Sequence, residues 1–156
     1  MLLDLGYHAV DLAQFLLGPL DFLSCTASRD GRPASIDDVE DRASVWARAG
    51  ATWIHLEIGR GVEKRERVVI ECAAGRFEAN RERLLWSDGT GGVRTLAESP
   101  RDWSRTMVEQ LDTFARAIDG DAASNELETQ LPALRFLEAC YARIRLDGVP
   151  AREAAR

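Results

Sequence analysis

The chain has 156 residues, of which 46% are hydrophobic and 29% charged, and its formal net charge is −6. This composition is typical of a soluble globular protein with a sizeable core and argues against a disordered chain. The acidic balance and the lack of an arginine-rich run argue against nucleic-acid binding. No apolar run approaches the roughly 20 residues that cross a membrane.

The three cysteines, Cys25, Cys72 and Cys140, lie far apart and match no metal-binding spacing. We therefore expect reduced, mostly buried thiols in a cytoplasmic protein. The first residues include Asp4 and no basic segment, so we expect no signal peptide.

In the first 40 residues, apolar side chains from Tyr7 to Leu17 recur at helical spacing. This spacing predicts a helix that ends at Gly18-Pro19. The stretch 20–28 predicts a strand, and the polar stretch 29–38 predicts a loop.

Alternating residues predict strands in the middle of the chain. The segment 39–58 is expected to form two strands around a turn at Ala49-Gly50. The alternation places two sets of residues on opposite faces: Val45, Ala47, Trp53 and His55 on one, and Ser44, Trp46, Ile54 and Leu56 on the other. Shorter strands are predicted over 67–72, 75–79 and 83–87. The glycine-rich stretch 87–95 predicts a loop, and it lacks the spacing of a phosphate-binding motif.

Two helices are predicted after Pro100. The first places one apolar face along its length and ends at Gly120. That face comprises Trp103, Met107, Leu111, Phe114, Ala115 and Ile118. The second begins near 124–125, and Pro132 either places its start nearer 129–131 or leaves a break there. It is expected to bury Leu134, Leu137, Tyr141 and Ile144 and to end at Gly148.

Strands in one run with helices grouped at the two ends predict an α+β fold. We expect an antiparallel-rich mixed β-sheet with helices packed on one face. The expected organisation is a single domain over residues 1–156.

The segment "LLDLGYHAVDLAQFLLGP" places Asp4, His8 and Asp11 at helical spacing. A carboxylate one turn from an imidazole can fix its protonated nitrogen and prepare it for acid/base chemistry. The alternative is structural: Asp4 caps the helix, His8 is half-buried, and Asp11 is solvated. His55 is expected on a strand face, and a metal site built from the two histidines lacks a supporting motif.

The same segment resembles a signature of the C-terminal, substrate-side domain of the Gfo/Idh/MocA (glucose–fructose oxidoreductase / inositol dehydrogenase) family. The matching positions are Leu3, Asp4, Gly6, His8, Asp11, Leu16 or Leu17, and Gly18. The segments "VEDRASVWARAGATWIHLEIG" and "MVEQLDTFARAIDGD…ALRFLEACYARIRLDGVP" resemble the family's paired strands and closing helices.

The resemblance implies an NAD(P)-dependent dehydrogenase that acts on a sugar or polyol in carbohydrate metabolism. His8 would be the acid/base on the substrate hydroxyl, and Asp4 would support it. Tyr7 and Asp11 would lie at the substrate.

The chain lacks the family's glycine-rich dinucleotide motif and its Glu-Lys-Pro motif, and its only lysine is Lys64. We therefore expect NAD or NADP to bind to a domain that is absent from this chain. The chain itself would be truncated at its N-terminus and inactive alone. Expected partners are a sugar or polyol, a second copy joined through the sheet, and a separate nucleotide-binding domain.

Two other functions remain open from the sequence. The first is a non-catalytic dimerisation or carbohydrate-binding module derived from such an enzyme. The second is a small metal-dependent enzyme, which only the residue types of His8 and the nearby acids favour.

Overall fold

A computed structural model describes residues 2–35, 38–60, 66–80, 82–98, 103–120 and 130–147. The chain divides into two compact units, and each is described by itself. Unit 1 comprises residues 1–62 and 125–156, and unit 2 comprises residues 63–124. The expectation of one domain over 1–156 stays a prediction.

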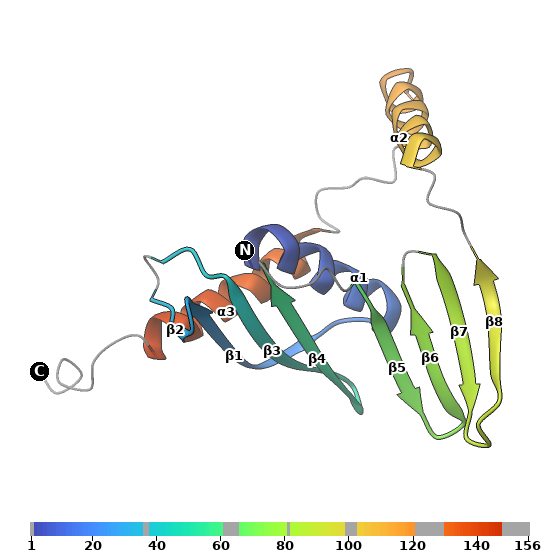
Figure 1. Cartoon of the computed structure of the whole chain (residues 1–156). Coiled ribbons are helices and arrows are strands. Elements are labelled where there is room, and N and C mark those ends of the chain that lie inside the picture. Colours follow the sequence, from blue (N-terminus) through green and yellow to red (C-terminus); the bar gives the residue numbers. More distant parts are fainter. Residues whose placement is uncertain are drawn as a thin grey trace, which may run out of the picture. The chain divides into compact units, whose positions relative to one another are not determined.

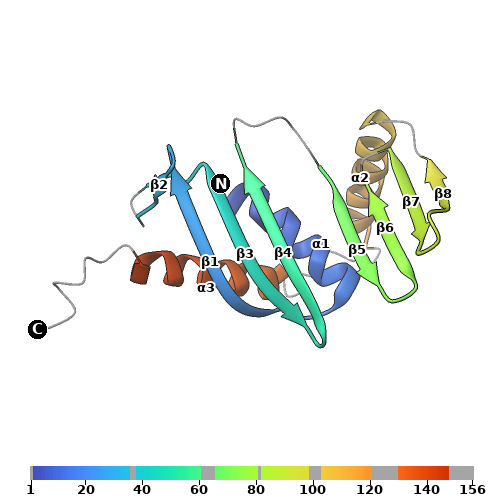
Figure 2. The ribbon, with the colours of Figure 1, turned by 60° about the horizontal axis from the view of Figure 1, so that its bottom comes forward.

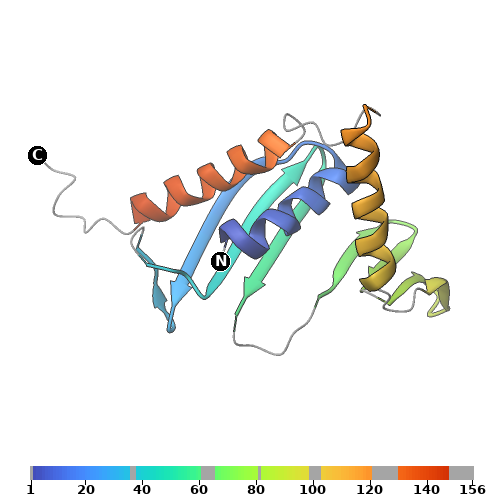
Figure 3. The same cartoon turned by 90° about the horizontal axis from the view of Figure 1, so that it is seen from above.

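Unit 1 is a four-stranded antiparallel sheet with two helices on one face (Figures 1 and 3). Its strands are β1 (Asp21–Arg29), β2 (Arg32–Pro33), β3 (Arg42–Ala49) and β4 (Thr52–Gly59), in the order β2-β1-β3-β4. Its two helices are α1 (Tyr7–Leu17) and α3 (Leu131–Asp147), and the short π-helical turn η1 (Leu2–Gly6) precedes α1. The α+β class and the covered face are confirmed, although all described strand pairs are antiparallel.

Helix α1 has the bounds that the apolar spacing predicts. Gly18 ends it with φ 85°, a conformation that favours glycine, and its N–H donates to the Gln14 carbonyl at 2.9 Å. Helix α3 begins at Leu131, so Pro132 lies in its first turn as expected. The alternative start near 124–125 lies outside the described residues.

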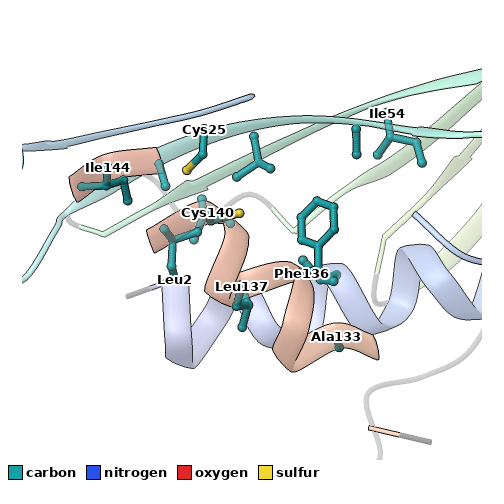
Figure 4. Close-up of a cluster of buried hydrophobic side chains, with 13 residues drawn as sticks. Leu2, Cys25, Ile54, Ala133, Phe136, Leu137, Cys140 and Ile144 are labelled. Atoms are coloured by element: carbon teal, nitrogen blue, oxygen red, sulfur yellow. The ribbon is translucent and has the colours of Figure 1, made fainter. Parts of the chain in front are cut away.

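The core of unit 1 lies between the sheet and the helices (Figure 4). Its residues come from distant parts of the sequence: Leu2, Val10, Cys25, Ala43, Val45, Ala47, Ile54, Ile58, Ala133, Phe136, Leu137, Cys140 and Ile144. Cys25 and Cys140 are buried as expected, whereas Cys72 is exposed. In α3 the buried stripe includes Ala133, Phe136 and Cys140, while the predicted Leu134 is 38% exposed.

The β3–β4 hairpin corrects the faces expected from the sequence. Its register pairs Val45 with Leu56 and Ala47 with Ile54. Paired residues point to the same face of a sheet, so these apolar residues share the helix-covered face. Trp46, which pairs with His55, lies on the other face. The expected grouping was wrong because only two residues separate the paired Ala49 and Thr52. With this turn length, the odd-numbered residues of β3 share a face with the even-numbered residues of β4.

Unit 2 contains a second antiparallel sheet, in the order β5-β6-β7-β8, and helix α2 (Figure 2). The strands are β5 (Val68–Cys72), β6 (Gly75–Ala79), β7 (Arg83–Asp88) and β8 (Val93–Glu98), and α2 spans Trp103–Ile118. The first three agree with the predictions. The prediction of a loop over 87–95 was wrong in part, because β8 begins at Val93. A turn precedes β8, and in it Asp88 accepts hydrogen bonds from the Thr90 and Gly92 amides.

Helix α2 carries the predicted apolar face. Met107, Leu111, Phe114 and Ile118 are between 53% and 70% exposed. A stripe of this kind normally packs against another element. The described residues of unit 2 leave this face of α2 exposed.

Candidate functional site

The site predicted from the sequence lies where η1 meets α1. Asp4 belongs to η1 and His8 to the first turn of α1, and both side chains are exposed. Both residues are described, and no hydrogen bond or ion pair joins them. The Asp4 carboxylate instead lies 3.5 Å from Nη2 of Arg60, measured from Oδ2.

Gly6 explains how this segment is held at the sheet. It is buried, and a Cβ at this position would come within 3.2 Å of the Ile58 side chain in β4. A side chain at this position would therefore require the Ile58 or Leu2 side chain to shift. The close packing of Gly6 on Ile58 holds η1 against β4, and Asp4 of η1 meets Arg60, which directly follows that strand.

Tyr7 and Asp11 differ in their surroundings. The half-buried Tyr7 packs against the core, and its hydroxyl donates a hydrogen bond to Oε1 of Gln130. Its ring meets the His8 ring edge-on at a centroid distance of 5.6 Å. Asp11 is half-buried in α1 and forms no hydrogen bond or ion pair within the described residues.

Glu40 is a buried carboxylate that the sequence analysis did not single out. It is 5% exposed, and its Oε1 accepts hydrogen bonds from the Leu2 amide at 2.6 Å and the Tyr141 hydroxyl at 3.1 Å. It therefore links the start of η1 to α3. No local pattern could reveal this link, because the partners lie 38 and 101 residues away in the sequence.

These contacts change the acidity of both side chains. Burial alone would raise the pKa of Glu40, but hydrogen bonds that include the one from Leu2 bring that pKa below its ordinary value. Burial raises the pKa of Tyr141 to about 12, and the neighbouring Glu40 charge adds to this effect. A charged Glu40 and a neutral Tyr141 are thus the favoured forms at neutral pH.

His55 lies on the face of the unit 1 sheet that α1 and α3 leave uncovered. Its Nε2 is 2.8 Å from the Ser44 hydroxyl, and its ring stacks on Trp46 at a centroid distance of 4.2 Å. Trp53, on the same face, is 64% exposed. His55 therefore has ordinary strand-face partners, as the sequence analysis expected.

No three His, Cys, Asp or Glu side chains among the described residues are grouped so that they could hold a metal ion. In the same part of the chain, no helix has the length and apolar character needed to span a membrane.

The sequence matches no known protein family and no curated protein. Solved structures do match. An oxidoreductase from Agrobacterium radiobacter, solved with NAD+, L-tartaric acid and magnesium, gives a TM-score of 0.68 at 18% identity over 96% of this chain. The UDP-N-acetylglucosamine 3-dehydrogenase of Acidithiobacillus ferrooxidans gives 0.64 at 18% identity over 88% of this chain.

The fold is similar to that of one part of these Gfo/Idh/MocA-type oxidoreductases. A third match is the WlbA dehydrogenase from Bordetella pertussis, solved with NADH and UDP-GlcNAcA, at a TM-score of 0.57, 16% identity and 95% coverage of this chain. The chain spans about half the length of these structures, with 48%, 46% and 44% of the three covered. The resemblance predicted from the opening motif is confirmed at the level of the fold.

Proposed function

We propose that the chain is the substrate-side half of an NAD(P)-dependent oxidoreductase that acts on the CH–OH group of a sugar or polyol. One observation carries this proposal: within a fold similar to part of known oxidoreductases, Asp4 and His8 have the spacing of the family's motif, and both side chains are exposed where η1 meets α1. Two solved relatives contain NAD+ or NADH, and one of them contains a UDP-sugar derivative.

In this function His8 removes the proton of the reacting hydroxyl. The O–H bond breaks as the carbon loses a hydride and becomes a carbonyl, so the substrate loses two electrons and His8 gains one proton. A bound nicotinamide would supply the hydride acceptor. The carboxylate of Asp4, four residues before His8, stabilises the positive charge that develops on the imidazole.

The described residues do not fit the cofactor. The pyrophosphate of a dinucleotide needs backbone N–H donors at a glycine-rich helix start. At the start of α1, Gly6 is packed against Ile58, and α3 begins with Leu131-Pro132. We therefore propose that NAD(P) is held by a nucleotide-binding domain outside this sequence, and that the chain alone is inactive.

The test uses the native protein, captured from its source cells with an antibody against this chain. The assay measures reduction of NAD+ and NADP+ with a panel of sugars, polyols and sugar acids. We expect activity with at least one substrate and a loss of about 100-fold or more in H8Q, the usual contribution of a general base. The matched variant H55Q removes the other histidine and should retain the activity.

The activity of H8Q decides the assignment. Unchanged activity in H8Q would overturn the role of His8. Absence of activity with every substrate would favour the alternative function below.

The alternative is a non-catalytic module that joins two copies of the chain through the sheet. It is favoured by the uncovered face of the unit 1 sheet, where Trp46 and Trp53 are 42% and 64% exposed. Exposed tryptophans of this kind are frequent at the centres of protein interfaces. Light scattering should show a dimer for the wild type and a monomer for W46S/W53S, whereas a monomeric wild type would contradict the interface.

A further inference from the structure

We infer that Arg60 selects substrates that carry an acidic group, such as sugar acids or sugar phosphates. This inference rests on the proposed function, because it takes Asp4 and His8 as the reacting site. The structure places the Arg60 guanidinium at this site, although 55 residues separate Arg60 and Asp4 in the sequence.

Arg60 reaches Asp4 from a backbone position that is fixed independently. It directly follows β4, and its N–H donates to the Asp41 carbonyl at 2.8 Å. Asp4, the partner of Arg60, lies in η1, and Gly6 of η1 packs against Ile58, two residues before Arg60. The fold therefore sets the backbone positions of Arg60 and Asp4, and their exposed side chains meet between them.

The pair is loose enough for a ligand to replace it. Nη2 and Oδ2 are 3.5 Å apart, which exceeds the 2.7–3.2 Å usual for a hydrogen bond. The Arg60 and Asp4 side chains are 64% and 65% exposed. An ion pair as exposed as this one contributes about 1 kcal/mol at most.

A substrate anion can make a better contact than Asp4 does. The guanidinium is planar and has five N–H donors, which match a carboxylate or phosphate in a two-point contact. Arg60 makes no other side-chain hydrogen bond or ion pair within the described part of the chain. An incoming anion would therefore find donors that are still available.

The spacing of the site suits one small molecule. Asp4 and His8 are four residues apart along consecutive helical turns, and the Asp4 carboxylate is in turn beside the Arg60 guanidinium. A molecule of monosaccharide size can place a hydroxyl at His8 and its acidic group at Arg60. A neutral sugar lacks the second contact, and Arg60 then stays paired with Asp4.

The inference is tested by NMR titration of the full 156-residue chain with D-glucuronate and D-glucose at equal ionic strength, following the ring signals of His8 and the side-chain signal of Arg60. We expect glucuronate to shift both signals and to bind at least 10-fold more tightly than glucose. R60Q should reduce glucuronate binding to the level of glucose, and R60K, which keeps the charge without the planar group, should fall between them.

The matched control is R29Q. Arg29 forms a comparable exposed pair with Asp30 at 3.8 Å in the same unit, and its loss should leave glucuronate binding unchanged. Amide spectra of all variants confirm that the fold is retained. If sulfate shifts Arg60 as strongly as glucuronate does and His8 stays unmoved, Arg60 is a general anion contact and the inference is wrong.

The titration also separates this inference from the proposed function. If both sugars shift His8 equally in wild type and R60Q, the site binds sugars without using Arg60, and only the inference fails. If neither sugar shifts His8, the proposed substrate site fails together with the inference.

Discussion

The link through Glu40 gives a quantitative prediction for the stability of unit 1. In E40A the buried Leu2 amide and the partly buried Tyr141 hydroxyl both lose their acceptor. A buried donor without a partner costs about 1–3 kcal/mol. Because two donors lose their acceptor, we expect E40A to lower the free energy of unfolding by about 2–6 kcal/mol. E40Q keeps an acceptor oxygen and should cost about 1–2 kcal/mol.

The assay is urea unfolding followed by NMR signals of β3 and β4 amides, which report unit 1 alone. Y141F removes one partner, so the double variant E40A/Y141F measures the coupling between Glu40 and Tyr141. Contacting residues of this kind usually couple by about 0.5–3 kcal/mol. A loss below about 0.5 kcal/mol in E40A would refute the reasoning, as would additive effects of the two substitutions.

The lowered pKa of Glu40 also sets the sign of a pH effect. A carboxyl whose pKa is lower in the folded state than in the unfolded state stabilises the protein above the unfolded value. That contribution is lost as the pH falls from the ordinary value of 4.5 through the folded-state pKa. The wild type should therefore lose more stability in this range than E40Q does, and equal slopes would contradict the assignment.

Three further predictions concern the core, the tyrosine and the cofactor. L137A truncates a side chain that is 1% exposed and should cost about 2–5 kcal/mol in urea unfolding, whereas L134A should cost less. Because the pKa of Tyr141 is raised to about 12, the wild type should lose stability between pH 10 and 12, and Y141F should lose less when unfolding is measured across that range. Titration calorimetry of the isolated chain should detect no NAD+ or NADP+ binding. Binding with micromolar affinity would contradict the proposal that the cofactor is held outside this sequence.

The sequence predicts the elements whose signals are local. The bounds of α1 follow from its apolar spacing and from Gly18-Pro19, and the β3–β4 hairpin follows from alternation around Gly50. The short strand β2 and the strand β8 were missed, because a two-residue strand has no period and β8 follows a glycine-rich turn. The prediction assigned the β4 residues to the wrong faces of the sheet, because their assignment depends on the length of the β3–β4 turn.

The candidate site was predicted only in its local part. The spacing of Asp4 and His8 is visible in the sequence, and their roles stay a prediction. The contacts that hold this segment in place join distant residues: Arg60 reaches Asp4, and Glu40 reaches Leu2 and Tyr141. Contacts of this kind depend on the register of β4 and on the packing of α3, which no single stretch of sequence specifies.

The most direct test of the central claim is transfer of deuterium from a carbohydrate to the nicotinamide ring. The native protein, captured from its source cells, is incubated with NAD+ or NADP+ and with substrates that carry deuterium at each CH–OH carbon in turn. Mass spectrometry should find deuterium in the reduced cofactor for the wild type and almost none for H8Q. Equal transfer by H8Q, or no transfer from any sugar or polyol by a folded protein, would contradict the assignment.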